Sequence, residues 1–120
     1  MDFFLKDDSG NVIATFEYHT TTEECKTCKA IVVKKGSFMS KDAYCSEKWK
    51  DCKWVDEGRA ELIKFNVVKD YDERYFLFVE DMVYNSPSKA VSFVMGHNEK
   101  DAWHLISNSE GDSLHKVYRY

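Results

Sequence analysis

The sequence predicts a small α+β domain in which a mostly antiparallel sheet packs against one or two helices. A chain of 120 residues has room for one compact domain, so we assign residues 1–120 to a single unit. Short apolar and β-branched runs separated by turn-forming residues favour strands, and the clearest local signal is that of one helix. Hydrophobic residues make up 43% of the chain, with one Pro and five Gly, which favours a folded core over a disordered chain.

The first strands are predicted near the N-terminus. The apolar segments FFLK and NVIATFEY are joined by the turn-forming residues DDSGN, a pattern typical of a β-hairpin. Residues 29–35 (KAIVVKK) have a continuous apolar centre and are followed by Gly36, which predicts a buried strand that emerges into a loop. Residues 40–54 are polar with scattered aromatic side chains and receive no assignment.

The middle of the chain predicts a short helix and then a strand. Apolar residues recur at roughly helical spacing after Gly58, which predicts a helix over residues 58–68 through Ala60, Leu62, Ile63 and Val67. The segment YFLFVEDMVYN is typical of a strand, and its acidic pair Glu80 and Asp81 is compatible with a tight hairpin.

The clearest local signal is the start of a helix at Ser86. Ser at an N-cap accepts a hydrogen bond from an unpaired amide, Pro87 suits the first helical position, and Gly96 supplies a left-handed end. We therefore expect a helix from Pro87 to Met95, packed on the sheet through its apolar face. After it, the segments AWHLI and LHKVYRY predict two closing strands around the turn SNSEGDS.

Charge is distributed unevenly along the chain, whose formal net charge is -4. Residues 1–24 carry -5 (one Lys, six acids), residues 25–53 carry +5 (eight Lys, three acids) and residues 54–120 carry -4 (eight bases, twelve acids). The basic segment also contains Phe38, Tyr44 and Trp49 and is followed by Trp54, and nucleic-acid surfaces use such mixtures of cations and rings. The alternative is a solvated lysine-rich face over ordinary core aromatics.

Four cysteines could complete a tetrahedral zinc site: Cys25, Cys28, Cys45 and Cys52. The first pair forms a C-x-x-C, but the second pair is spaced more widely than in a typical zinc ribbon. A redox role would require the C-x-x-C at the start of a helix after a buried strand, whereas the polar sequence HTTTEE precedes it here. The main expectation is therefore incidental thiols and no cofactor, with zinc as the alternative.

Several segments together resemble a known family, in this order: VVKKGS, the helix Arg59 to Ile63, the strand YFLF, the run DMVYNSPSKAVSFVMG, Trp103 and EGDSL. They resemble the domain-of-unknown-function 4357 family over about residues 30–115. The most specific element is the motif S-P-S-x-A-A, present as Ser86, Pro87, Ser88, Ala90 and Val91. Family members are commonly appended to GIY-YIG-type endonucleases and DNA methyltransferases, and they are similar to the restriction-enzyme adenine-methylase-associated domain. The resemblance therefore implies a DNA-related accessory module, with DNA, a nuclease or a methyltransferase as partner.

Two segments are candidates for contacts to DNA. The helix start at Ser86, Ser88 and Lys89 could cradle a phosphate, because unpaired amides and the helix dipole favour an anion, although simple capping explains the same residues. The loop after the predicted buried strand could contact backbone phosphates through Lys34, Lys35, Gly36 and Ser37. Three further lysines could lie alongside it: Lys26, Lys29 and Lys41. Trp103 is either a core residue or a platform for base stacking.

No catalytic motif is present in the sequence. The four histidines are dispersed along the chain: His19, His97, His104 and His115. No H-E-x-x-H, G-x-S-x-G or P-loop occurs, and the carboxylates are spread over charged sequence. We therefore expect no enzymatic activity, but a non-catalytic DNA-binding accessory module related to restriction or defence. The alternative is a protein-interaction module such as an adaptor, an inhibitor or an immunity-type protein. Without a signal-peptide pattern or a long apolar run, we expect a cytoplasmic protein with no membrane partner.

Overall fold

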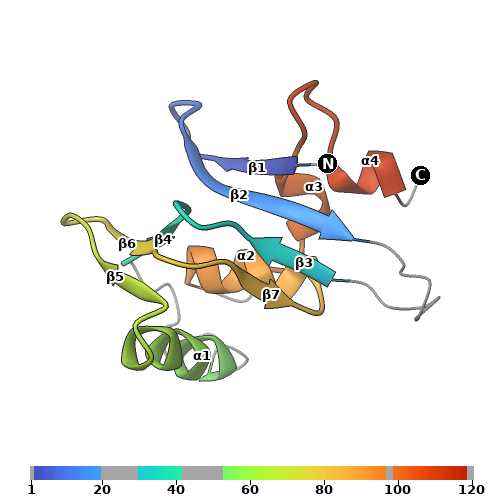
Figure 1. The fold of residues 1–120 in the computed structure, drawn as a ribbon. Coiled ribbons are helices and arrows are strands. Elements are labelled where there is room, and N and C mark those ends of the chain that lie inside the picture. The colour runs from blue at the N-terminus through green and yellow to red at the C-terminus, as the bar shows by residue number, and fades with distance from the viewer. Residues whose placement is uncertain (1, 20–29, 42–52, 97–98, 119–120) are drawn as a thin grey trace.

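The computed structural model describes residues 2–19, 30–41, 53–96 and 99–118, which form two antiparallel sheets and four helices (Figure 1). The α+β fold class is therefore confirmed. The bounds are β1 Asp2–Lys6, β2 Val12–His19, β3 Ala30–Val33, β4 Phe38–Ser40, α1 Lys53–Lys64, β5 Val68–Asp70, β6 Tyr75–Phe78, β7 Met82–Tyr84, α2 Pro87–Met95, α3 Ala102–Leu105 and α4 Leu114–Tyr118.

The larger sheet has the strand order β1-β2-β3-β7. The predicted hairpin and the predicted third strand are confirmed as β1, β2 and β3. The hairpin turn is fixed by Asp7, whose Oδ1 accepts the backbone N–H groups of Ser9 and Asn11, both at 2.9 Å. Gly10 occupies the left-handed conformation in this turn, with φ 85°. Local turn chemistry therefore sets the register of the first two strands.

The smaller sheet has the order β4-β6-β5, and it corrects the prediction for residues 75–85. The predicted hairpin through Glu80 and Asp81 is wrong, because β6 pairs with β4 and β5 while β7 pairs with β3 in the larger sheet. Both edges of β6 are already occupied, so β7 has no room beside it. The Asp81 carboxylate accepts the backbone N–H of Lys35 at 2.7 Å, which anchors the segment where it crosses between sheets.

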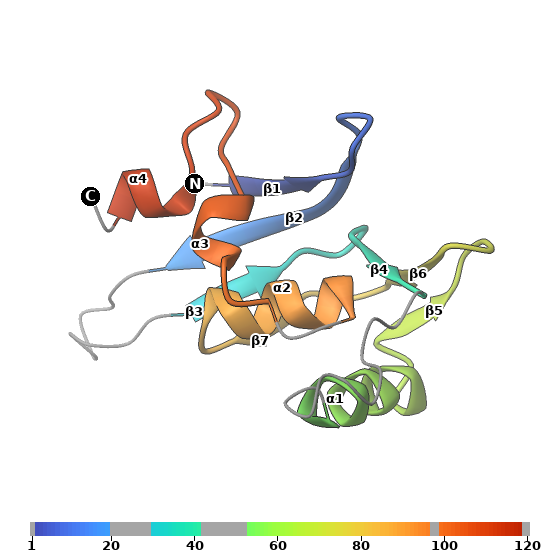
Figure 2. The same cartoon turned by 180° about the vertical axis from the view of Figure 1, so that it is seen from behind.

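The helix predicted at Pro87–Met95 is confirmed with both of its ends. The Ser86 Oγ accepts the backbone N–H of Lys89 at 3.2 Å, and Gly96 ends the helix with φ 88°. The helix contacts β3 and β7 of the larger sheet and β4 of the smaller one. Figure 2 shows α2 lying across the strands, with α3 above it and α1 below it. This helix therefore holds the two sheets together.

The helix predicted at 58–68 exists but spans Lys53–Lys64. Gly58 is inside the helix, where the ring of Phe93 packs so closely that a Cβ atom on Gly58 would meet it at 2.3 Å. The helix ends before Asn66, which has a left-handed φ of 58°. Apolar spacing alone therefore placed both boundaries too late, because Val67 belongs to the turn that leads into β5.

The two strands predicted at the C-terminal end are wrong, because both segments are short helices, α3 and α4. Asp101 O accepts the backbone N–H of His104 at 3.0 Å, and Ser113 Oγ accepts that of Lys116 at 3.1 Å. Ser113 therefore starts α4 through its side chain, whereas Asp101 contributes only its backbone carbonyl to α3. Between the two helices, Ser107 forms isolated antiparallel bridges with Phe4 of β1 and with Ser113.

The core lies between the inner face of the larger sheet, α2 and the smaller sheet. Its largest fully buried side chains come from both sheets and from the helices: Phe3, Phe16, Ile31, Met39, Phe78, Val91, Val94, Ile106 and Leu114. No helix within the described ranges is long and apolar enough to span a lipid bilayer.

Candidate functional site

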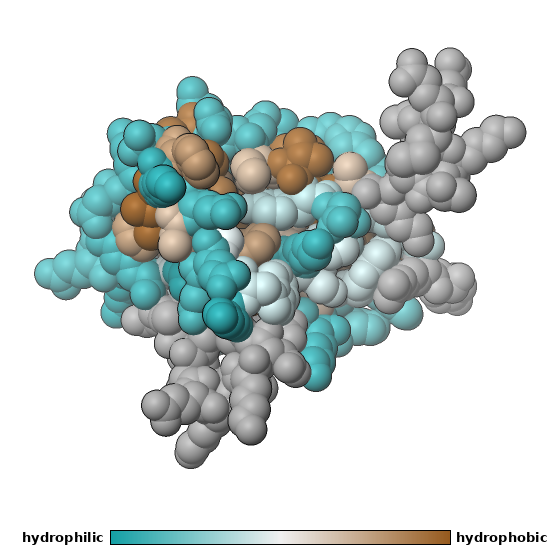
Figure 3. All heavy atoms as spheres, turned by 90° about the horizontal axis from the view of Figure 1, so that it is seen from below, coloured by the Kyte–Doolittle hydropathy of each residue, from teal (hydrophilic) through white to brown (hydrophobic). Residues whose placement is uncertain are grey.

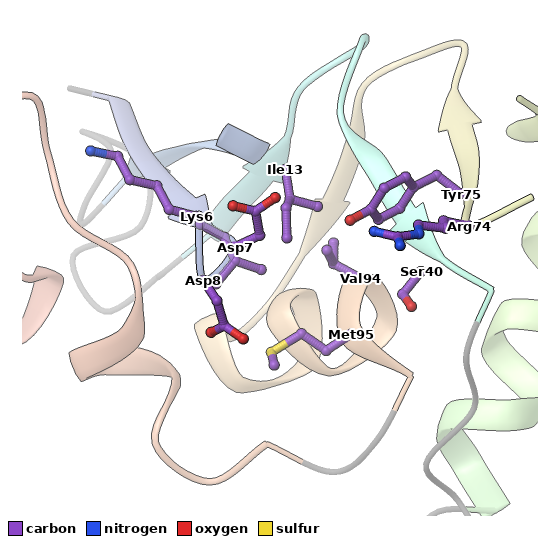
Figure 4. Close-up of a pocket in the computed structure, with 10 residues that line it drawn as sticks. Lys6, Asp7, Asp8, Ile13, Ser40, Arg74, Tyr75, Val94 and Met95 are labelled. Atoms are coloured by element: carbon purple, nitrogen blue, oxygen red, sulfur yellow. The ribbon is translucent and has the colours of Figure 1, made fainter. Parts of the chain in front are cut away.

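A hollow of about 480 Å³ opens between the β1–β2 turn and the smaller sheet (Figure 4). This volume lies within the range of about 300–1,000 Å³ that is usual for small-molecule sites. Apolar side chains form its floor and polar side chains its walls: Leu5, Lys6, Asp7, Asp8, Ile13, Ser40, Arg74, Tyr75, Val94 and Met95.

Arg74 and Tyr75 form the wall on the side of the smaller sheet, where Figure 4 shows both polar ends directed toward the hollow. The turn before β6 fixes their backbone, because the Asp72 Oδ1 accepts the N–H groups of Arg74 and Tyr75, both at 2.8 Å. No carboxylate in the described part of the chain forms an ion pair with the Arg74 guanidinium. This planar group is therefore available to a phosphate or a carboxylate.

The wall opposite Arg74 is acidic. Asp7 already accepts two backbone N–H groups in the hairpin turn, whereas Asp8 is exposed and has no such partner among the described residues. The hollow thus combines a hydrogen-bond donor wall with an acceptor wall over the apolar residues Ile13, Val94 and Met95. Such an arrangement suits a ligand that carries both an amine and an anionic group.

Three aromatic rings continue this surface beyond the hollow. The Phe38 ring centroid lies 4.8 Å from that of Tyr71 and 5.3 Å from that of Tyr75. Tyr71 is 56% exposed, while Phe38 and Tyr75 are half-buried. We call Phe38, Tyr71 and Tyr75 the ring cluster. Because Tyr75 belongs to both features, the ring cluster and the hollow form one continuous surface.

The strand register explains why Phe38 and Tyr75 share one face of the smaller sheet. Ser40 pairs with Tyr75, while Phe38 and Lys69 both pair with Leu77, so alternate residues of the three strands share the outer face. The residues between them point inward, and Met39 and Phe78 are fully buried. Lys69 is exposed on this outer face, and no described carboxylate pairs with it.

The predicted loop at Lys34 to Ser37 directly precedes Phe38 of the ring cluster and is partly occupied by internal contacts. The Lys34 Nζ lies 3.1 Å from the Glu17 carboxylate, which raises the pKa of Lys34 through that hydrogen bond and charge. The Ser37 side chain is buried, and its Oγ bonds both the N–H and the C=O of Thr15. Lys35 has an exposed side chain and Gly36 a left-handed φ of 93°.

The predicted helix start and the predicted stacking residue are also engaged in the fold. The Ser86 hydroxyl caps α2, Ser88 is half-buried, and the Lys89 side chain is exposed. Trp103 is only 8% exposed and packs edge-on against Tyr18 at 5.5 Å. Its position in the core corresponds to the structural alternative rather than to a platform for bases.

Other predicted residues are tied up or lie outside the description. Lys41 forms an ion pair with Asp70 and lies over the Phe76 ring at 5.1 Å. Outside the described residues lie Lys26, Lys29 and His97. The same is true of the four candidate zinc ligands: Cys25, Cys28, Cys45 and Cys52. Where the chain is described, no group of three or more His, Cys, Asp or Glu side chains is arranged to hold a metal ion.

Sequence reasoning missed Tyr71, Arg74 and Tyr75. Every residue of the strand YFLF is aromatic or aliphatic, so its pattern does not show which alternate residues face outward. The one available signal was the cluster of rings around a cation in YDERYF, of which only Tyr75 and Phe76 were assigned, to a strand.

Comparison with known proteins identifies the family of this chain. No curated protein and no solved structure matches it significantly. A family model does match, over residues 14–118, which is most of the chain. This chain therefore belongs to the family described as domain of unknown function (DUF4357).

Proposed function

We propose that this chain is a non-catalytic DNA-binding accessory module that holds unpaired bases against the smaller sheet. The observation that carries the proposal is the ring cluster, three adjacent rings on one sheet face beside the Arg74 guanidinium, which no described carboxylate pairs with. Sheets that bind single strands combine such rings with cations that follow the phosphates.

The chemistry of each part supports a single strand over a duplex. Stacking on an aromatic side chain contributes about 1–3 kcal/mol per base, and it requires a base face that a duplex keeps covered. Arg74 would hold a phosphate, and a base in the hollow would donate its exocyclic amine toward Asp8. The apolar floor would contact the remainder of the base.

The proposal assigns no reaction to the chain. A role in restriction or defence, and a nuclease or methyltransferase as partner, rest on the family resemblance that the sequence suggested. Cations are few on this surface, so binding would depend on stacking more than on charge. With Arg74 and Lys69 neutralising two phosphates, the slope of log affinity against log salt should be about -1.4, at about -0.7 per phosphate.

The test is a fluorescence anisotropy titration of labelled single-stranded DNA of about 12 nucleotides, with matched RNA and duplex DNA as competitors. We expect single strands to bind with the shallow salt slope, and Tyr71→Ala to weaken binding about tenfold, within the range of one lost stacking contact. The matched control is Phe65→Ala, which removes a ring that is 68% exposed on another surface. Equal losses in both variants, or no binding at low salt, would refute the proposal.

A second pair of variants separates this surface from the lysine-rich loop. Lys35→Glu combined with Lys89→Glu reverses two exposed charges that the sequence indicated as phosphate contacts. Lys34 is left unchanged, because a carboxylate there would oppose Glu17. We expect this double variant to retain single-strand binding, whereas Arg74→Glu loses it. The opposite pattern would move the DNA site to the loop and the start of α2.

A further inference from the structure

The outer edge of β7 is an open strand edge. In the order β1-β2-β3-β7, the described residues contribute no strand beyond β7. The opposite edge of the sheet is covered, because Phe4 and Ser107 exchange both backbone hydrogen bonds, at 2.7 and 3.1 Å. Open edges expose unpaired N–H and C=O groups that accept another extended chain.

The register shows which backbone groups point outward. Lys34 N–H donates to Thr15 O at 2.9 Å, so the even-numbered residues of this stretch bond toward β2. Residues 31 and 33 of β3 therefore bond toward β7, through Tyr84 and Met82. The N–H and C=O of Val83 are left facing away from the sheet. The Val83 side chain is also 61% exposed.

A small apolar pocket lies beside this edge. Its volume is about 190 Å³, and residues of α1, α2 and β7 line it: Gly58, Glu61, Leu62, Phe65, Val67, Met82, Tyr84 and Phe93. This is below the usual size of a small-molecule site, so it suits one large apolar side chain. Figure 3 looks at the molecule from this side and shows brown apolar atoms at its left and upper centre, framed by teal hydrophilic ones.

Acidic residues lie in and around the pocket. Glu61 lines the pocket, Glu57 lies one turn earlier on α1, and Glu80 precedes β7. The Glu57 carboxylate is 3.9 Å from the Lys53 Nζ, a weak exposed pair, and Lys64 lies over the Phe65 ring at 5.6 Å. Among the described residues, Glu61 is the one charged residue in the lining of this pocket, and its carboxylate favours a basic occupant.

We propose that β7 captures an extended segment of a partner protein that carries a large apolar side chain two residues away from Lys or Arg, so that both side chains face the pocket. The segment adds a strand to the larger sheet through the Val83 N–H and C=O. Its apolar side chain enters the pocket over Phe93, and its basic side chain lies against Glu61. Strand addition of this kind takes affinity from the main chain and specificity from pockets for alternate side chains.

Charge decides between this occupant and two others. A second copy of this chain would bring the same carboxylates into opposition, and a nucleic acid would bring phosphates against them. A basic peptide removes that repulsion. The surface is separate from the ring cluster, so this interaction stands or fails independently of the proposed DNA binding.

The experiment is a selection from a phage-displayed library of random peptides against the full chain, followed by measurements on the selected peptides. We expect sequences with a large apolar residue two positions away from Lys or Arg. NMR hydrogen exchange should show the Val83 amide, which exchanges readily in the unbound protein, becoming protected when a selected peptide binds.

Three variants complete the test. Val83→Pro removes an N–H that the sheet itself does not use, and Phe65→Glu alters an exposed pocket residue without affecting the core. Each should weaken peptide binding by about tenfold or more, while Val12→Glu, at an exposed valine on β2, should leave it unchanged. The proposal is overturned if no peptide is enriched, or if peptides bind all three variants equally. A dimer that Val83→Pro dissociates would also overturn it, because the edge would then belong to a second copy.

Discussion

The two sheets of this protein present different outer faces to solvent. On the outer face of the larger sheet, the Glu17 carboxylate lies 3.1 Å from the Lys34 Nζ and 3.2 Å from the His19 Nε2. Polar side chains therefore pair with one another on this face. On the smaller sheet the corresponding face carries the ring cluster with Lys69. Exposed charged pairs satisfy each other and contribute little energy, whereas exposed rings retain apolar area that a ligand can cover.

The inner faces of the two sheets are alike, because both bury large apolar side chains against α2. Phe16 of the larger sheet and Phe78 of the smaller one are both fully buried. The two sheets therefore differ at the alternate residues that face solvent, and these residues contribute little to the stability of the fold. The exposed rings of the smaller sheet support it as the binding surface that we propose, and the difference between the sheets yields four predictions.

The largest expected effect separates buried rings from exposed ones. Phe16→Ala should lower the free energy of unfolding by about 3–5 kcal/mol, because it removes a fully buried ring. Tyr71→Ala should change it by less than about 0.5 kcal/mol, because most of that ring faces solvent. Urea denaturation followed by circular dichroism measures both. A comparable loss in Tyr71→Ala would make the ring cluster part of the core and remove the basis of the comparison.

The next effect concerns the contact between α1 and α2. Gly58→Ala should destabilise the protein by about 1–3 kcal/mol, because the added Cβ would lie 2.3 Å from the Phe93 ring. Helix propensity alone predicts the opposite, a gain of about 1 kcal/mol. In a Phe93→Leu background the same substitution should therefore cost much less. Equal costs in the two backgrounds would show that Gly58 is required for another reason.

A smaller effect of opposite sign is expected at the open edge. The Tyr84 hydroxyl is buried without a hydrogen-bond partner in the described structure, and this burial raises the pKa of Tyr84. Tyr84→Phe should therefore stabilise the protein by about 1 kcal/mol and raise Tm by about 4 °C. Tyr75→Phe, on the outer face of the smaller sheet, should change stability by less than about 0.5 kcal/mol. A loss of stability in Tyr84→Phe would reveal a partner for this hydroxyl.

The smallest effect tests the charged pairs on the larger sheet. The Lys34 hydrogen bond and charge lower the pKa of Glu17 below its ordinary value of 4.5. A lowered pKa stabilises the folded state above pH 4.5, and this contribution is lost as the pH falls through the pKa of the folded protein. Lys34→Met should move the NMR titration midpoint of Glu17 upward, toward its ordinary value. An unchanged midpoint would mean that the pair does not persist in solution.

Local signals in the sequence predicted the fold better than they predicted the candidate site. The Asp7 turn and the Ser86 cap act within a few residues, so β1, β2 and α2 were readable from short motifs. The end helices were mistaken for strands, because apolar spacing over four or five residues does not distinguish the two. The ring cluster required knowing which face of β6 is buried, and that information is tertiary. The lysines chosen from charge alone did not converge with the rings.

The crossing between sheets at Asp81 has a consequence for how the protein folds. Val33 and Met82 are neighbours in the larger sheet, yet the whole of the smaller sheet lies between them in the sequence. During synthesis, β7 can join β3 only after β4, α1, β5 and β6 have left the ribosome. Closing such a long loop is entropically costly and slow, so the open edge should be among the last parts to form. A partner strand bound there would also trap the completed fold.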